Sequence, residues 1–217
     1  MTRFFVWNWI FVAILSSQVV AAPEEPAPAN NPELELRHFL TDVTTLAAGF
    51  RQQLFDSNGR SMQDSRGRFY IERPGRFRWE YDQPEQLVVC DGQLLWMYDH
   101  DLEQVTVRTV DDTLRGTPAM LLSGQGQLDE SFEIGATYEE DNLAWLEMAP
   151  RGENPEFKSV RVGMDNGTVA VMEVRDSLDQ VTRIDFHDLE LDPNLKASLF
   201  QFVPPEGVDV IGEGVDF

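Results

Sequence analysis

The feature that most constrains the fold is a series of short segments in which apolar and polar side chains alternate. In residues 76–82, Phe77, Trp79 and Tyr81 alternate strictly with charged residues. Successive side chains of a β-strand point to opposite faces, so this segment predicts a strand with one apolar and one charged face. Further strands are expected at residues 68–72, 87–90, 93–98, 103–109, 132–138, 143–148, 157–164, 168–175 and 181–191, with Phe200–Phe202 closing the sheet.

The residues between these strands favour hairpins. Asp91-Gly92 and Asp165-Asn166-Gly167 suit the left-handed backbone of tight hairpin turns. Many short strands joined by such turns are typical of one large antiparallel sheet that curls on itself. The expected fold class is therefore mainly β with helices, built on a single curved antiparallel sheet.

Helical periodicity is found in two places. Residues 33–55 are expected to form one long amphipathic helix, and residues 117–122 a short apolar helix beginning at a proline. These two elements are available to cover the open side of the sheet. Their apolar residues expected to face it are Leu36, Phe39, Leu40, Val43, Met120, Leu121 and Leu122.

The N-terminus has the layout of a secretory signal peptide, with Arg3, an apolar run over 4–20, and small residues at Ala21 and Ala22. An uncleaved anchor is the alternative, because the run is nearly long enough to span a bilayer. The polar 16–18 segment and the small residues favour cleavage over an anchor, and Pro23 favours a cut after Ala21 rather than after Ala22. We therefore expect a signal peptide at 1–21, a flexible leader at 22–32, and one domain at 33–217 of a soluble periplasmic protein.

Composition and motifs argue against several functions. The formal net charge of −21 disfavours binding to nucleic acid. Cys90 is the only cysteine, so no internal disulfide can form and no lipid-attachment cysteine follows the signal peptide. His38, His100 and His187 lie in no nucleophile motif and at no metal-ligand spacing. We expect no catalysis, metal or cofactor, and a structural role for Cys90.

The apolar face of the predicted sheet is rich in aromatic residues. Its members at alternating strand positions are expected to be Phe69, Ile71, Phe77, Trp79, Tyr81, Trp96, Tyr98 and Trp145. Periodicity alone favours an ordinary core for such residues. The small number of covering elements favours the alternative, a ligand surface that helices partly cover.

Arg73 shares strand parity with Phe69 and Ile71, which predicts an inward-pointing guanidinium. A buried guanidinium needs acceptors, and carbonyls at the ends of the covering helices are the natural ones. Arg73 would then act as a latch on those helices. Alternatively, Pro74 and Gly75 shift the register and leave Arg73 solvated at a strand end.

The order of several motifs resembles the LolA family, the periplasmic carriers of outer-membrane lipoproteins, over essentially the whole mature chain. The motifs are RPGRFRW at 73–79, DGQLLWMYD at 91–99, FRQ at 50–52, LEQV at 102–105, TP at 117–118 and FQFVPPEGVDV at 200–210. The resemblance implies an incomplete, half-open β-barrel under a helical lid, with a hydrophobic cavity for acyl chains. It also implies that Arg73 holds the lid closed and that Phe77 handles cargo and partners.

The resemblance further implies loading by an inner-membrane ABC transporter of the LolCDE type and delivery to an outer-membrane acceptor of the LolB type. A monomer without cofactors is expected. The acidity exceeds what we expect of the family. The alternatives are an acceptor, which would carry a lipid-modified cysteine, an envelope lipid- or protein-sensing module of the same fold, and a hydrolase that uses dispersed carboxylates.

Overall fold

The computed structural model describes residues 31–110, 121–124, 128–151 and 157–212. The first half contains α1 (Pro32–Asp42), β1 (Thr45–Phe55), β2 (Ser61–Glu72), β3 (Arg76–Asp82), β4 (Glu85–Asp91), β5 (Leu94–Asp99) and β6 (Gln104–Thr109). After the helical residues Leu121 and Leu122 follow α3 (Leu128–Ser131), β7 (Phe132–Glu140), β8 (Leu143–Pro150), β9 (Phe157–Asp165), β10 (Thr168–Asp176), β11 (Val181–Leu191), the 3-10 helix η1 (Ala197–Phe200) and β12 (Asp209–Gly212). The expected signal peptide, most of the leader and Met120 lie outside the described residues.

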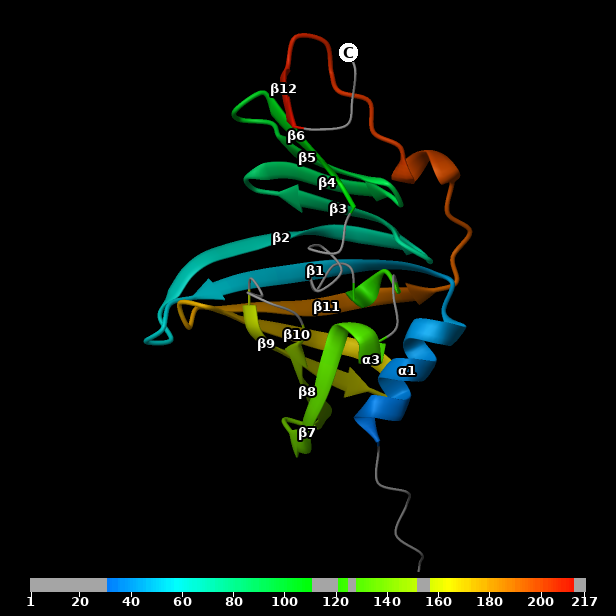
Figure 1. The fold of residues 1–217 in the computed structure, drawn as a ribbon, viewed down its shortest axis with the longest axis vertical. Helices are drawn as coiled ribbons and strands as arrows, with labels where there is room; N and C mark the ends of the chain where they lie inside the picture. The colour runs from blue at the N-terminus through cyan, green and yellow to red at the C-terminus, as the bar shows by residue number, and fades with distance from the viewer. Residues whose placement is uncertain (1–30, 111–120, 125–127, 152–156, 213–217) are drawn as a thin grey trace, which may run out of the picture.

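The strands form one sheet in the order β12-β6-β5-β4-β3-β2-β1-β11-β10-β9-β8-β7 (Figure 1). Neighbouring strands are antiparallel, apart from β12, which pairs with β6 in parallel. The expected mainly-β fold with one open antiparallel sheet is confirmed. β1 lies between β2 and β11, so it joins the hairpins of the first half to those of the second.

The single helix expected over residues 33–55 is wrong beyond its first half. α1 ends at Asp42, and β1 begins at Thr45. Leu46, Phe50 and Leu54 satisfy a helical spacing, but they also fall on alternate residues of a strand. Because β1 is hydrogen-bonded to a strand on each side, long-range pairing outweighs local helix propensity.

Polar contacts flank both ends of α1. Asn31 accepts hydrogen bonds from the N–H groups of Glu33 at 3.1 Å and Leu34 at 3.3 Å, so the helix begins at Pro32, inside the expected leader. Past the other end, Asp192 Oδ1 accepts from the Thr44 N–H at 2.7 Å. The chain therefore turns sharply from α1 into β1 at a contact with the residue that follows β11.

The two faces of the sheet differ in what covers them. We call the face on which α1 and α3 lie the inner face, and the opposite one the outer face (Figure 1). α1 packs against β8, β9 and β10 on the inner face. The main apolar cluster fills this side and includes Leu36, Phe39, Leu46, Ala48, Phe50, Phe69, Ile71, Phe77, Trp79, Cys90, Leu121, Leu122, Leu146, Val162, Met172 and Ile184.

A second apolar cluster lies on the outer face of β4, β5 and β6, where the C-terminal segment covers it. Its members are Val89, Trp96, Val105 and Val107, with Phe202, Val208 and Val210 packed against them. The strand expected at Phe200–Phe202 is wrong, because Phe200 ends η1 and Phe202 packs against Trp96 at 5.6 Å between ring centroids. The chain joins the sheet later, at β12.

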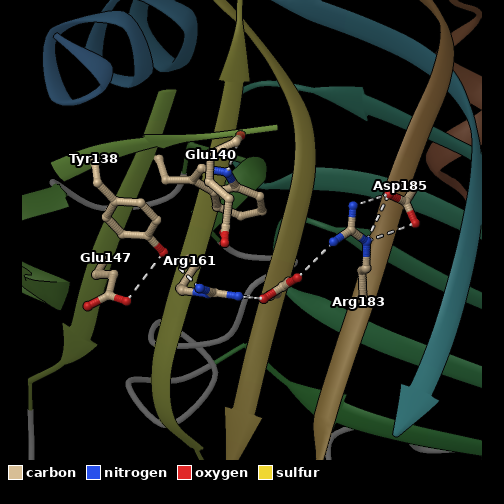
Figure 2. Close-up of polar contacts among 8 residues, drawn as sticks. Tyr138, Glu140, Glu147, Arg161, Arg183 and Asp185 are labelled. Atoms are coloured by element: carbon tan, nitrogen blue, oxygen red, sulfur yellow. Dashed lines mark hydrogen bonds and ion pairs between the residues drawn. The ribbon is translucent and has the colours of Figure 1, made fainter. Parts of the chain in front are cut away.

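The outer face of β8 to β11 carries a continuous polar network (Figure 2). Glu173 is only 8% exposed and accepts from Arg161 Nε at 3.0 Å and from Arg183 Nη1 at 3.0 Å. Arg161 also donates to the Tyr138 hydroxyl at 2.7 Å, and Arg183 to Asp185 at 3.0 Å. One carboxylate of β10 thus compensates two arginines, one on β9 and one on β11, the strands on either side of it.

We predict that Glu173→Gln lowers the free energy of unfolding by about 1–3 kcal/mol, because it leaves two partly buried guanidinium groups without their shared carboxylate. The measurement is urea denaturation followed by circular dichroism. The matched control is Asp179→Asn in the exposed pair with Lys158, which we expect to leave the stability nearly unchanged, because solvent screens this pair. Equal losses in the two variants would contradict the prediction.

Candidate functional site

Five of the residues expected on the apolar face lie together on the inner face: Phe69 and Ile71 of β2 with Phe77, Trp79 and Tyr81 of β3. The register pairs Phe69 with Trp79 and Ile71 with Phe77. Charged residues and Tyr70 occupy the alternate positions, so the side chains of both strands sort between the two faces. The two strands therefore present one continuous aromatic surface.

Phe50 of β1 lies at the centre of this surface and was missed, because residues 33–55 were expected to be helical. Its ring centroid lies 5.2 Å from that of Trp79 and 5.1 Å from that of Tyr81, in edge-to-face geometry. Gly67 makes room for these rings, since a Cβ there would lie 3.0 Å from Phe50 Cε1 and 1.8 Å from the Glu80 carbonyl oxygen. The signal that could have revealed the site is the alternation of Leu46, Ala48 and Phe50.

Trp96 and Tyr98 lie on the outer face, contrary to expectation. The ring of Phe202 packs against both, with centroids at 5.6 Å and 6.0 Å. Leu95 and Met97 occupy the inner positions of β5 instead. The residues of β5 are apolar on both faces, so its alternation does not indicate which side faces inward.

Trp145 is also on the outer face. Its Nε1 donates to the Glu140 carbonyl at 3.1 Å, and the Arg161 guanidinium lies 5.2 Å from its ring centroid. Its neighbours Ala144 and Leu146 belong to the inner cluster. Trp96, Tyr98 and Trp145 are therefore excluded from the candidate site.

Part of the inner face remains open to water. Several apolar residues of the inner face are only partly buried, among them Tyr81, Val88, Met97, Val174 and Phe186. These five come from β3, β4, β5, β10 and β11, whereas α1 packs against β8, β9 and β10. Burying such surface stabilises by about 25 cal/mol per Å². The arrangement is suited to binding an apolar ligand beside the covering helices.

Arg73 connects the sheet to both helical segments. Its Nη1 donates to the carbonyl of Val43, at the end of α1, and its Nε donates to the carbonyl of Leu122 at 3.1 Å. The guanidinium carbon lies 4.9 Å from the centroid of the Phe39 ring. Arg73 thus points inward and finds the helix-end acceptors that its parity predicted, and it is not a solvated residue at a strand end.

The turn after Leu122 closes against Arg73. The Gly75 N–H donates to the Ser123 carbonyl at 3.0 Å. Gly124 has a φ of +66°, and a Cβ there would lie 2.8 Å from Arg73 Cδ. A side chain at residue 124 would be strained by its backbone and would also collide with the arginine.

The contacts of Arg73 are only partly favourable. Burial lowers the pKa of its guanidinium to about 10, because the charged form loses contact with water. The negative charge of Asp192 raises this pKa and offsets part of the effect. Hydrogen bonds to a charged donor are worth about 1.5–3 kcal/mol each, and this desolvation offsets part of that. The connection between the sheet and the helices is therefore weaker than its geometry alone suggests.

Two buried side-chain donors lack an acceptor within the described part of the chain, and both belong to the inner face. They are Arg73 Nη2 and Trp79 Nε1. Native proteins pair the large majority of such groups, so an exception calls for a physical explanation.

The residues expected to cover the sheet join the inner cluster wherever they are described. These are Leu36, Phe39, Leu40, Val43, Leu121 and Leu122. Whether they move as a lid stays a prediction.

The three histidines lie apart, His38 in α1, His100 after β5 and His187 in β11. Within the described ranges, no group of three or more His, Cys, Asp or Glu residues is placed to hold a metal ion. Cys90 is buried in the inner cluster, where burial raises the pKa of its thiol to about 11.

No helix in the described parts of the chain has the length and apolar character needed to cross a bilayer.

Comparison with known proteins identifies relatives over most of the chain. The sequence model of a family described as "Outer membrane lipoprotein carrier protein LolA" matches residues 41–203. An outer-membrane lipoprotein carrier protein of Nitrosomonas europaea is 40% identical over 204 residues, which cover 93% of this chain and 97% of the relative. One of Methylococcus capsulatus is 42% identical over 180 residues, covering 82% and 86%.

Among solved structures, an uncharacterised conserved protein from Thermus thermophilus has a similar fold. The TM-score is 0.52 at 11% sequence identity, and the match covers 84% of this chain and all of the other. At this identity the likeness concerns the fold alone.

We predict that Arg73→Leu makes the Cys90 thiol react about 3- to 10-fold faster with a thiol reagent, because leucine cannot donate to the two helix-end carbonyls. The measurement is the rate of labelling of the native, ligand-free protein at fixed pH. Arg66→Leu is the matched control, since Arg66 is exposed on the same strand, and it should leave the rate unchanged. Equal rates in wild type and Arg73→Leu would show that Arg73 does not hold the cover in place.

Proposed function

The chain belongs to the LolA family of outer-membrane lipoprotein carrier proteins, and we propose that it carries the acyl chains of lipoproteins on its inner face. The observation that carries this proposal is the set of partly buried apolar residues on five strands beside a helical cover. Each methylene group withdrawn from water contributes about 0.8 kcal/mol, so a multiply acylated protein needs such a surface to cross an aqueous space.

We propose a carrier role without catalysis. The inner surface around Phe50, Trp79 and Tyr81 consists mostly of rings and hydrocarbon, which supply contact area to acyl chains, and the Tyr81 hydroxyl is bonded to Gln52. Phe77 lies within this surface, paired with Cys90 of β4, and is proposed to contact cargo.

We propose that α1 and the helical residues Leu121 and Leu122 form a lid, with Arg73 as its latch. Cargo that enters beneath the lid displaces the bonds from Arg73 to Val43 and Leu122. The same bonds re-form when cargo leaves, so they favour release. A weak latch suits both steps, because binding must be reversible without a source of energy on this chain.

The route of the cargo is part of the proposal. Residues 1–21 direct export to the periplasm as a signal peptide, and the mature chain acts there as a monomer. An inner-membrane transporter of the LolCDE type loads it with ATP-derived energy, and an outer-membrane acceptor of the LolB type receives the lipoprotein. The net charge of −21 favours basic docking surfaces on these partners.

The test is extraction of cargo. Inner-membrane vesicles that contain a LolCDE-type transporter and a triacylated lipoprotein are incubated with ATP and the purified mature protein. We expect lipoprotein to appear in the soluble fraction, bound to the carrier. A lipoprotein whose lipid-bearing cysteine is replaced by alanine should not be extracted. Failure to solubilise the acylated form would contradict the proposed function.

We predict that Arg73→Leu accepts cargo within about 2-fold of wild type but transfers it to the acceptor about 10-fold more slowly, because the lost hydrogen bonds no longer favour the empty, closed state. The measurement is the rate at which lipoprotein moves from the purified complex to acceptor-bearing membranes. Arg66→Leu serves again as the control. Normal transfer by Arg73→Leu would exclude the latch.

A further inference from the structure

The indole N–H of Trp79 is an unusual feature of the inner face. The side chain is only 6% exposed, and its Nε1 has no acceptor among the described residues. Its neighbours are the rings of Phe50, Phe69 and Tyr81, with centroids at 5.2, 5.1 and 6.5 Å. The one hydroxyl among them, that of Tyr81, donates to Gln52 Oε1 at 3.1 Å. The donor is therefore held among groups that do not accept from it.

Trp145 shows how the same fold treats a tryptophan that serves packing alone. It is 2% exposed, and its Nε1 donates to the Glu140 carbonyl at 3.1 Å. Buried tryptophans usually find such a partner, because burying an unpaired N–H opposes folding. The contrast indicates that the partner of Trp79 lies outside the described part of the chain.

Arg73 Nη2 is the other buried donor without an acceptor in the described part of the chain, and it too belongs to the inner face. The unpaired donors are thus confined to the surface that cargo is proposed to occupy. A surface that binds plain hydrocarbon gains nothing from such donors. A surface that binds a ligand with hydrogen-bond acceptors in its apolar part can use them.

We propose that the Trp79 Nε1–H donates a hydrogen bond to a carbonyl oxygen of the bound acyl group. This inference rests on the proposed function and deepens it. Acyl chains are joined to a lipoprotein through ester or amide linkages, so a carbonyl oxygen stands at the head of each hydrocarbon chain. Trp79 is then a specificity-determining residue, by which the face distinguishes acyl groups from alkyl groups of the same length.

The test compares two ligands that differ in the carbonyl. Dioctanoylglycerol carries ester-linked chains, and dioctylglycerol carries ether-linked chains of the same length without a carbonyl. Both are titrated calorimetrically into the mature protein, and the ratio of the ether Kd to the ester Kd is taken. We expect Trp79→Phe to lower this ratio about 2- to 10-fold relative to wild type, the worth of one hydrogen bond.

Two further variants keep the test decisive. Replacing Trp79 by benzothienylalanine removes the N–H while keeping the shape of the side chain, so it should lower the ratio as Trp79→Phe does, even if phenylalanine disturbs the packing. Trp145→Phe removes an indole N–H on the outer face and should leave the ratio at its wild-type value.

A ratio that is unchanged in both Trp79 variants overturns the inference and leaves the carrier role intact, since it means that water or no group satisfies the donor. An equal fall in Trp145→Phe also overturns it, because the effect is then not specific to the inner face. Failure of the wild-type protein to bind either ligand overturns the acyl-binding function itself.

Discussion

The antiparallel pairing of β1 with β11 joins two runs of hairpins into one sheet. From β2 to β6, and again from β7 to β11, strands that are consecutive in sequence pair with each other. β1 contacts both groups along its whole length. Without this pairing each half would expose an edge, and the inner cluster would be divided between them. The contact of Asp192 with Thr44 places α1 at the same junction, so the position of the cover depends on it as well.

The sequence predicts the strands well wherever one face is apolar and the other charged. β3 has the expected bounds, because alternation there leaves one arrangement that buries the apolar side. It fails at β1, where Leu46, Phe50 and Leu54 fit both periodicities and only distant pairing decides. Alternation also fails to assign a face to Trp96, because β5 is apolar on both faces and the C-terminal segment covers the outer one.

The residues of the candidate site could likewise be predicted only in part from local patterns. Phe69, Phe77 and Trp79 could be placed from alternation alone, and the inward direction of Arg73 followed from its parity with Phe69. Phe50 was not placed in this way, because residues 33–55 also fit a helical spacing and only the pairing of β1 with β2 and β11 decides between helix and strand. The acceptors of Arg73, the carbonyls of Val43 and Leu122, depend on where two helical segments end, which is a property of the folded chain and not of any local pattern.

The short strand β12 bears on how an open sheet stays dispersed in solution. A strand at the margin of a sheet presents unpaired backbone groups that invite another polypeptide to join. β12 occupies the backbone groups of β6 over four residues and is itself too brief to offer a long template. At the opposite margin, β7 has an irregular register between Ile134 and Thr137 and ends in acidic residues. The fold can therefore leave its interior accessible from one side while discouraging self-assembly along its borders.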